Sequence, residues 1–260
     1  MKIAMTDMDI VWEDEKANRE RCRTLIKEAA ENRADCILFP EMTLTGFSMA
    51  VEKIQDRDRE SILFFSELAK RYQIAVGFGY VTAEGTKGKN HFCFVDEQGE
   101  ILADYEKIHP FTYGGESAAY GGGNTICSFV WRGLTCGVFI CYDLRFPEAF
   151  QQLPLETDAV FLIANWPESR LEHWYTLLKA RAIEMQCYVI GVNRIGEGGG
   201  LHYAKSSAAF SPEGERLNEM QGKENRYVEL DKYSRREYVK NFPTRTDRRP
   251  EVYTSQSIKK

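Results

Sequence analysis

The chain has 260 residues, of which 43% are hydrophobic and 28% are charged, and its formal net charge is −5. This length is enough for one large α/β domain with a buried core, and it is short for two catalytic domains. The charge argues against a protein that binds nucleic acid mainly through phosphates, and no segment approaches the about 18 apolar residues that a membrane span requires.

The first part of the chain predicts a strand, a helix, a second strand and a second helix. Residues 1–11 form an apolar strand pattern, and residues 34–40 form a short buried strand that ends at a proline. Between them, residues 13–34 have the spacing of an amphipathic helix, with apolar or small side chains at Cys22, Leu25, Ile26, Ala29 and Ala30. A second helical stripe consists of Ile62, Phe65, Leu68, Ala69 and Tyr72.

Strands outnumber helices in the rest of the chain. The predicted elements are a strand at 73–81, hairpins at 91–107 and 125–141, a helix from Pro147, a strand at 158–165, a helix at 171–186, a strand at 187–195, a hairpin at 204–217, a strand at 226–231, and a final short helix and tail. Mixed sheets covered by helices fit this order better than a purely parallel sheet. Because we find no internal repeat and no linker, we expect residues 1–260 to form a single domain.

The cysteine pattern indicates a reducing compartment. Seven cysteines with no C-x-x-C spacing argue against a disulfide framework and against a structural zinc site: Cys22, Cys36, Cys93, Cys127, Cys136, Cys141 and Cys187. Most of them lie in apolar runs, which is typical of small buried side chains. The N-terminus lacks the pattern of a signal peptide, so we expect a cytoplasmic protein.

Three predicted strands end at side chains that suit catalysis. Glu41 follows CILFP, Lys107 and His109 follow ILADY, and Cys141 follows GVFI. In open α/β sheets, functional residues gather beyond the carboxyl ends of the strands. A carboxylate can deprotonate a thiol, and a lysine can stabilise the thiolate and the oxyanion that forms when a carbonyl or nitrile is attacked. Backbone N–H groups at the turn after Cys141 offer a further oxyanion donor.

Each of these residues also has an ordinary structural interpretation. Glu41 alone fits a surface carboxylate, Lys107 fits a solvated charge at a strand end, and Cys141 fits a buried core cysteine. Spacing alone therefore suggests an active-site triad without establishing it.

The segments around these three residues resemble the nitrilase, or carbon–nitrogen hydrolase, superfamily. FPEMTLTGF resembles its glutamate segment, YEKIHPF its lysine segment and GVFICYDLRFPE its nucleophile segment, in the family's order. The match extends from the N-terminal strand to about residue 215. The resemblance implies that Glu41 is the general base, Lys107 the catalytic lysine and Cys141 the nucleophile.

The resemblance also implies a fold and a reaction. The fold is an αββα sandwich of two mixed sheets, with subunits that stack as a homodimer, and we expect residues 231–260 to contribute dimer contacts. The reaction is hydrolysis of a non-peptide C–N bond through a cysteinyl thioester, without a metal or an organic cofactor. Lys107 and the backbone N–H of Tyr142 would hold the oxyanion.

A fourth match is Glu116, in GGESAAYGGGN, which corresponds to a second family glutamate beside the lysine. Two carboxylates flanking one ammonium would keep Lys107 charged even where it is partly desolvated. The alternative is an ordinary loop carboxylate. The neighbouring Gly121, Gly122 and Gly123 do not form a P-loop, because no G-K-[ST] ending follows them.

Within the superfamily, the whole chain is most similar to the bacterial ω-amidase branch, which hydrolyses ω-amides such as α-ketoglutaramate, α-ketosuccinamate and succinamate. Such substrates carry a distal carboxylate, for which a planar arginine fork is suited. Arg170 is our candidate, with Arg145 and Arg181 as alternatives, although Glu184 at i+3 favours an ion pair for Arg181. The predicted pocket walls are Asn165, Trp166, Phe47 and Tyr113.

Other functions remain open at this point. A papain-like Cys–His hydrolase would need one of the four histidines, which are His91, His109, His173 and His202. A catalytically silent binding homologue is disfavoured because Glu41, Lys107, Cys141 and Glu116 are all present. Related branches that act on other small amides, N-carbamoyl compounds or nitriles are further alternatives. We expect no nucleic-acid or membrane partner.

Overall fold

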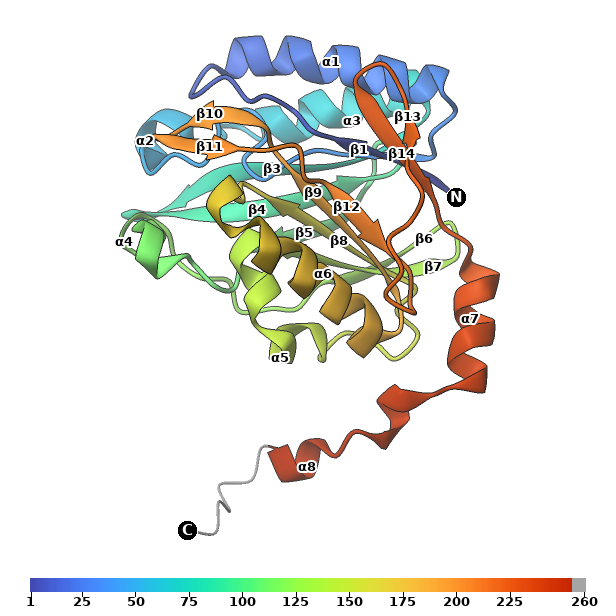
Figure 1. Ribbon diagram of the computed structural model, residues 1–260. Helices are drawn as coiled ribbons and strands as arrows, with labels where there is room; N and C mark the ends of the chain where they lie inside the picture. Colours follow the sequence, from blue (N-terminus) through green and yellow to red (C-terminus); the bar gives the residue numbers. More distant parts are fainter. Residues whose placement is uncertain (254–260) are drawn as a thin grey trace, which may run out of the picture.

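Two mixed sheets packed face to face form the centre of the computed structural model, which describes residues 1–253 (Figure 1). Helices cover the outer face of each sheet, so the layers follow the order helix, sheet, sheet, helix. This is the αββα sandwich that the family resemblance implied. Residues 254–260, the end of the predicted C-terminal tail, lie outside the described residues.

The first sheet has seven strands, and its three central strands are parallel. In spatial order the strands are β13 (Met220–Gln221), β14 (Asn225–Glu229), β1 (Lys2–Thr6), β2 (Cys36–Leu38), β3 (Ala75–Glu84), β4 (Lys87–Val95) and β5 (Ile101–Glu106). The hairpins make β4 antiparallel to both β3 and β5, so β5 runs in the same direction as β2. The carboxyl ends of β2 and β5 therefore point to the same edge of the sheet.

The second sheet has five strands, again with a parallel centre. In spatial order they are β12 (Ala208–Phe210), β9 (Tyr188–Asn193), β8 (Ala159–Ala164), β7 (Leu134–Ile140) and β6 (Ser128–Trp131). A separate two-stranded hairpin consists of β10 (Gly196–Gly198) and β11 (Leu201–Tyr203).

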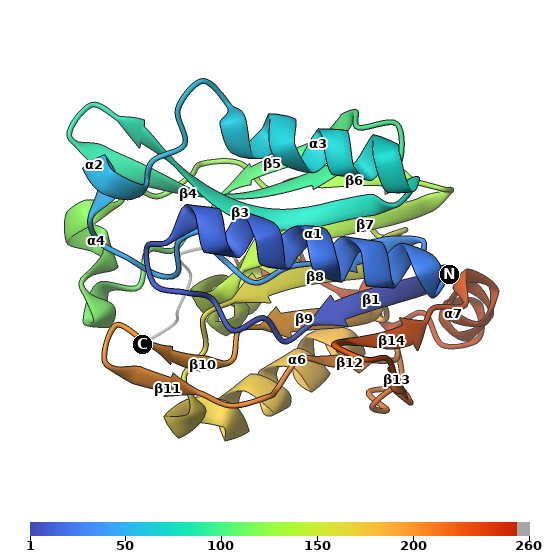
Figure 2. The same cartoon turned by 90° about the horizontal axis from the view of Figure 1, so that it is seen from above.

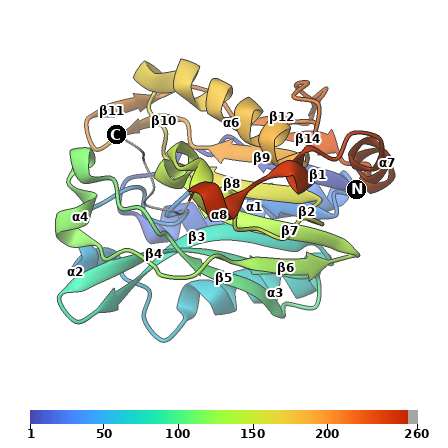
Figure 3. The ribbon, with the colours of Figure 1, turned by 90° about the horizontal axis from the view of Figure 1, so that it is seen from below.

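The long helices are amphipathic and each covers one sheet. On the first sheet, α1 (Glu15–Glu31) and α3 (Glu60–Tyr72) lie side by side (Figure 2). Asp14 caps α1 by accepting a hydrogen bond from the N–H of Ala17 at 3.0 Å. On the second sheet lie α5 (Pro147–Phe150) and α6 (Leu171–Met185) (Figure 3). The remaining helices are α2 (Val51–Ile54), α4 (Glu116–Ala119), α7 (Lys232–Asn241) and α8 (Pro250–Tyr253).

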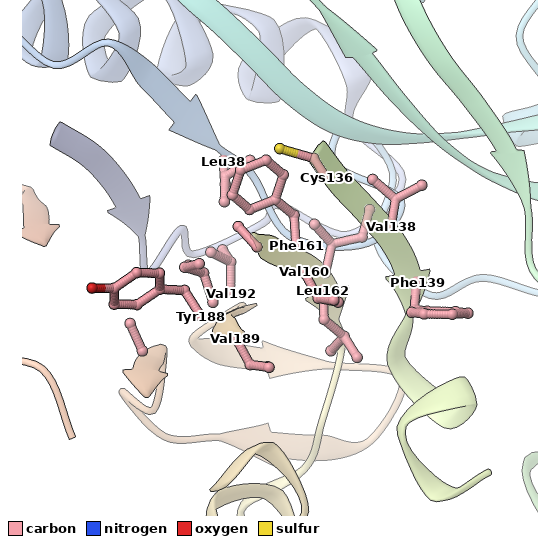
Figure 4. Close-up of a cluster of buried hydrophobic side chains, with 14 of the residues drawn as sticks. Leu38, Cys136, Val138, Phe139, Val160, Phe161, Leu162, Tyr188, Val189 and Val192 are labelled. Atoms are coloured by element: carbon pink, nitrogen blue, oxygen red, sulfur yellow. The ribbon is translucent and has the colours of Figure 1, made fainter. Parts of the chain in front are cut away.

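The inner faces of the two sheets share one apolar core. Leu38 of β2 belongs to the same buried cluster as Val138 of β7 and Phe161 of β8 (Figure 4). The ring of Phe94 in β4 stacks on Phe161, with the ring centroids 5.7 Å apart. Complete burial of such a side chain stabilises the fold by about 1.5–3 kcal/mol. Because the sheets share this core, we propose that the chain forms one domain.

The structure corrects one local prediction, confirms a second and adds a hairpin that was not predicted. The helix expected from Pro147 is the single turn α5. The hairpin expected at 204–217 is confirmed in a short form: β12 leads into a turn at Ser211–Gly214, Phe210 forms an antiparallel bridge with Arg216, and the N–H of Leu217 donates to the carbonyl of Ala209 at 2.9 Å. The hairpin β10–β11 was not predicted, because the stretch GEGGG contains no alternating apolar side chains.

Candidate active site

The carboxyl ends of four strands, two from each sheet, meet at one edge of the sandwich. Glu41 follows β2, Lys107 follows β5, Cys141 follows β7 and Asn165 follows β8. Glu41 accepts a hydrogen bond from Lys107, which follows a strand of the same sheet, and another from Asn165, which follows a strand of the second sheet. The structure thus brings the four strand ends together.

Close packing against β3 positions Glu41. The N–H of Thr43 donates to the carbonyl of Gly79 at 3.0 Å, and the N–H of Gly79 donates to the Thr43 hydroxyl at 2.9 Å. A Cβ on Gly79 would lie 2.4 Å from the nitrogen of Met42, so only glycine allows this approach. The Glu41 side chain is completely buried.

The ammonium of Lys107 lies between two buried carboxylates. Its Nζ is 3.0 Å from Oε1 of Glu41, and 3.0 and 2.8 Å from the two oxygens of Glu116. Burial by itself lowers the pKa of Lys107, but Glu116 and Glu41 outweigh this effect and hold the pKa well above its usual value. Lys107 is therefore a permanent positive charge in the interior, with the ring of Phe47 centred 5.4 Å from Nζ.

Two asparagines hold Glu41 from opposite sides. The side-chain amide of Asn90, in β4, donates to Oε1 of Glu41 at 2.7 Å and to Glu116 at 3.1 Å. The backbone N–H of Asn165 donates to Oε2 of Glu41 at 2.9 Å, and its side-chain amide donates to the Glu41 carbonyl at 2.7 Å. Sequence analysis missed Asn90, because an asparagine inside a strand carries no local signal of its partners.

Cys141 begins a 3-10 turn (Cys141–Arg145) directly after β7, and its φ is +43°. A non-glycine residue in this left-handed region is uncommon, and such strain clusters at functional sites. Buried Asp143 holds the turn by accepting hydrogen bonds from the N–H of Ile140 at 3.1 Å, the N–H of His109 at 3.0 Å and the Tyr105 hydroxyl at 2.8 Å. The turn therefore presents Cys141 at the end of the strand, as the sequence predicted.

The surroundings of Cys141 favour the neutral thiol. Burial, followed by the negative charge of Glu41, raises the pKa of the thiol well above its usual value, and Lys107 offsets only part of the rise. A thiol in this state needs a base before it can act as a nucleophile. The buried carboxylate of Glu41 provides one in the same cluster.

One pocket opens onto Cys141 and contains about 410 Å³ of empty space, part of it open to solvent. Aromatic and apolar side chains with a few polar groups form its lining, which is typical of a small-molecule site. The lining residues are Phe47, Phe111, Cys141, Tyr142, Arg145, Asn165, Trp166, Pro167, Arg170, Leu201 and Tyr203. Of these, Phe111, Pro167, Leu201 and Tyr203 were not among the predicted site residues.

Arg145 and Arg170 both line this pocket. The Arg145 guanidinium lies 4.7 Å from the Trp166 ring centroid, and that of Arg170 lies 5.5 Å from the Phe111 centroid. Within residues 1–253, neither arginine has a carboxylate within 4.0 Å. Burial, and in smaller part the charge of Arg170, lowers the pKa of Arg145. The pocket thus contains two cations without a counter-ion.

The other candidates separate into two groups. Phe47, Asn165 and Trp166 line the pocket, whereas Tyr113 does not: its side chain is 87% exposed, because the 3-10 turn Thr112–Gly114 directs it outward. Phe111 supplies the aromatic wall from that loop. Arg181 forms the expected ion pair with Glu184 at 2.8 Å and also donates to the carbonyl of Leu144, outside the pocket.

No histidine in the described part of the chain forms a hydrogen bond with Cys141. The rings of the four histidines contact other groups: His91 contacts Thr82 and Asp104, His109 contacts Asp143, His173 contacts Arg145, and His202 contacts Glu197. This arrangement gives no support to the papain-like alternative, which requires a thiol–imidazole pair.

Comparison with known protein sequences gives a consistent result. The sequence model of the carbon-nitrogen hydrolase family matches residues 2–238. The chain is 34% identical over 252 residues to omega-amidase YafV of Escherichia coli K12, covering 95% of this chain and 96% of that protein. It is 29% identical over 257 residues to 2-oxoglutaramate amidase of Bacillus subtilis 168, covering 96% and 98%.

Solved structures share the fold. XC1258 from Xanthomonas campestris, a CN-hydrolase superfamily protein with an arsenic adduct in its active site, matches with a TM-score of 0.88 and 29% identity, covering 96% of this chain and 97% of that one. An amidase from Nesterenkonia sp. matches with a TM-score of 0.84 and 24% identity, covering 97% and 95%. At that lower identity, the second likeness concerns the fold alone.

Proposed function

The chain belongs to the carbon–nitrogen hydrolase family, and from that premise we propose that it is an ω-amidase, which releases ammonia from the terminal amide of small dicarboxylic acid monoamides. As an enzyme it is a cysteine-dependent hydrolase of linear amides. The pair Arg145 and Arg170 is the observation that supports this substrate class. Both arginines share a pocket with Cys141, and neither has a carboxylate partner among residues 1–253. A substrate carboxylate would complete their charge balance.

In the proposed mechanism, Glu41 accepts the thiol proton and the sulfur of Cys141 attacks the amide carbon. Lys107 and the backbone N–H of Tyr142 stabilise the oxyanion. The proton held by Glu41 passes to the leaving nitrogen, so that ammonia departs and a thioester remains. Glu41 then takes a proton from water, whose oxygen attacks the thioester, and the thiol leaves with that proton. The route assigns no step to a metal or a cofactor.

The geometry supports a separate role for each carboxylate. Both oxygens of Glu116 accept from Lys107, and they also accept from Asn90 and the Phe111 N–H. Only Oε1 of Glu41 accepts from Lys107, whereas its Oε2 accepts from the Asn165 N–H. Glu41 is also the charge that most strongly raises the pKa of the Cys141 thiol. We therefore assign proton transfer to Glu41, and to Glu116 the role of keeping Lys107 charged.

An ammonia-release screen tests the substrate class. The panel is α-ketoglutaramate, α-ketosuccinamate, succinamate, glutamine, an N-carbamoyl amino acid, a neutral short amide and a nitrile. We expect the monoamides of dicarboxylic acids to give the highest kcat/KM. Preference for the neutral amide or the nitrile would contradict the ω-amidase proposal while leaving the hydrolase chemistry intact.

Hydrolysis of N-carbamoyl amino acids is the second candidate, because these substrates also carry a carboxylate that Arg145 and Arg170 can bind. The same screen separates the two activities. Replacing Cys141 with serine should abolish either one, whereas His91→Ala and His202→Ala should leave activity intact, since both rings contact groups other than Cys141.

We also propose a cytoplasmic homodimer whose C-terminal segment contacts the partner subunit. The segment that contains α7 and α8 projects from the side covered by α5 and α6 (Figure 1). Phe242 and Tyr253 on this segment are 57% and 63% exposed, and we propose that they contact the partner subunit.

The cytoplasmic location is supported by seven free cysteines. No helix within residues 1–253 has the length and apolarity needed to cross a membrane.

A further inference from the structure

The hairpin β10–β11 places one tyrosine, Tyr203, in the wall of the pocket that contains Cys141. The hairpin is attached to the first loop of the chain, since the N–H of Ile195 donates to the carbonyl of Met8 at 3.0 Å and Ile195 forms a bridge with Asp9. The Tyr203 side chain is therefore presented by a strand that is fixed at its base.

A buried arginine holds the Tyr203 ring in place. The Arg194 guanidinium lies 4.6 Å from the ring centroid. Arg194 is completely buried and donates to the carbonyls of Ile10 at 2.9 Å and Glu197 at 2.7 Å. Gly198 makes this contact possible, because a Cβ there would lie 2.4 Å from Nη1 of Arg194. The ring orientation is thus set by a rigid support.

The Tyr203 hydroxyl has no partner within the part of the chain that the structure describes, although the residue is only 2% exposed. Because Tyr203 lines the pocket, a bound molecule can reach this hydroxyl. Burial, with smaller contributions from Cys141 and Glu41 and an opposing one from Arg194, raises the pKa of Tyr203 to about 12. At neutral pH the hydroxyl is therefore a proton donor, and Tyr203 lines the same pocket as Cys141, Arg145 and Arg170.

We propose that Tyr203 is a specificity-determining residue, whose hydroxyl donates a hydrogen bond to the 2-oxo group of a 2-oxo dicarboxylic acid monoamide. This inference rests on the proposed ω-amidase function. In such a substrate, Cys141 and Lys107 engage the amide, and Arg145 and Arg170 engage the carboxylate. The 2-oxo oxygen is the polar atom that remains, and it only accepts hydrogen bonds. A 2-ammonium group in its place would be repelled by the two arginines, which disfavours glutamine.

Two substrates of equal length isolate this contact. α-Ketoglutaramate carries the 2-oxo group and glutaramate lacks it. We expect Tyr203→Phe to lower kcat/KM for α-ketoglutaramate about 10–100-fold, because a donor matched to a substrate oxygen is lost. The loss for glutaramate should stay below about threefold. An equal loss for both substrates, or no loss for either, would overturn the inference.

A matched control and a second measurement keep the test independent of folding. Tyr233→Phe removes a hydroxyl from α7, where the side chain is 72% exposed, and should leave both rates unchanged. In the unmodified protein, the inhibition constant of 2-oxoglutarate should be lower than that of glutarate by a factor of about five or more. Equal inhibition constants would refute the role of Tyr203. If the unmodified protein hydrolyses neither monoamide, the proposed function itself fails, which is a separate result.

Discussion

Glu116 accepts two hydrogen bonds from the Nζ of Lys107, at 3.0 and 2.8 Å, and both side chains are buried. Glu41 accepts only one bond from the same ammonium, at 3.0 Å. In the proposed mechanism, Lys107 therefore keeps its contact with Glu116 when Glu41 takes up the thiol proton. Replacement of each glutamate should therefore have a different consequence.

Glu116→Gln should weaken both activity and stability. Burial lowers the pKa of Lys107, and Glu116 is the carboxylate that opposes this effect most strongly. Without its charge, the pKa of Lys107 should fall and activity should be lost at alkaline pH. Because the folded-state pKa is raised, this pairing stabilises the protein below the unfolded lysine pKa of about 10.4, and its loss should cost about 3–5 kcal/mol at neutral pH. The pH profile of kcat/KM and urea unfolding measure both effects. Glu67→Gln, on the exposed face of α3, is the control. An unchanged alkaline limb would contradict this role for Glu116.

Glu41→Gln should act in opposite directions on turnover and on thiol reactivity. It removes the base, so amide hydrolysis should fall by about 10²–10⁴-fold. It also removes the main charge that raises the pKa of Cys141, so direct alkylation at pH 8 should become faster. Mass spectrometry of iodoacetamide-treated protein gives the rate, with half-buried Cys127 as an internal reference. In the unmodified protein, labelling should still rise at pH 9; a plateau below pH 7 would indicate a depressed pKa and refute this account.

The parts of the site that could be predicted lie where an apolar run ends. Glu41, Lys107 and Cys141 each follow a buried strand, and parallel strands bring their carboxyl ends to one edge. Asn90 lies inside β4, and its importance depends on two loops that approach it from distant parts of the chain. Tyr203 was missed for another reason: its hairpin is short and glycine-rich, without a periodic pattern.

Local backbone geometry decides which arginine and which aromatic side chain of the loop after Lys107 face the pocket. Arg145 was an alternative to Arg170 as the carboxylate anchor, and the structure places it in the pocket against Trp166. One 3-10 turn decides that Phe111 faces the pocket and Tyr113 faces solvent. Spacing along the chain does not specify the direction of side chains in such short turns. The sequence analysis therefore named Tyr113 from this loop, whereas Phe111 of the same loop lines the pocket.

Asp143→Asn should lower kcat more than it changes KM. Asp143 accepts from Ile140, His109 and Tyr105 around the turn that presents Cys141, and an amide cannot accept all of these bonds. We expect a loss of about 1.5–3 kcal/mol in stability and a tenfold or greater fall in kcat. Tyr105→Phe removes a single bond to the same carboxylate and should have a smaller effect on both. A change in KM alone would show that Asp143 does not position the nucleophile.

Removal of residues 242–260 should convert the proposed dimer to a monomer. Light scattering should give a mass near twice the 29.9 kDa of one chain for the full-length protein and near one chain for the shortened form. Arg245 and Arg248 anchor this segment to the carbonyls of Leu153 and Gln151, at 2.9 and 2.8 Å, so the substitutions Phe242→Ser and Tyr253→Ser provide a test that keeps the anchors. A full-length monomer, or a dimer that survives both changes, would contradict the proposal.

Arg170→Ala should raise KM for α-ketoglutaramate far more than KM for a neutral short amide such as butyramide. A bidentate contact with a carboxylate contributes about 1.5–3 kcal/mol, which corresponds to a 10–100-fold change for the charged substrate and to no more than about threefold for the neutral one. Arg145→Ala should show the same selectivity, with some loss toward butyramide as well, because Arg145 also packs on Trp166.

The two substitutions should not be additive, since both arginines line one pocket and would share one carboxylate. Arg71→Ala, at the exposed end of α3, is the matched control and should leave both KM values unchanged. Equal effects of Arg170→Ala on both substrates would remove Arg170 from the role of anchor. If Arg145→Ala alone were selective for the charged substrate, the carboxylate would be assigned to Arg145. Selectivity in neither variant would refute carboxylate binding by this pair, and with it the observation on which the ω-amidase proposal rests.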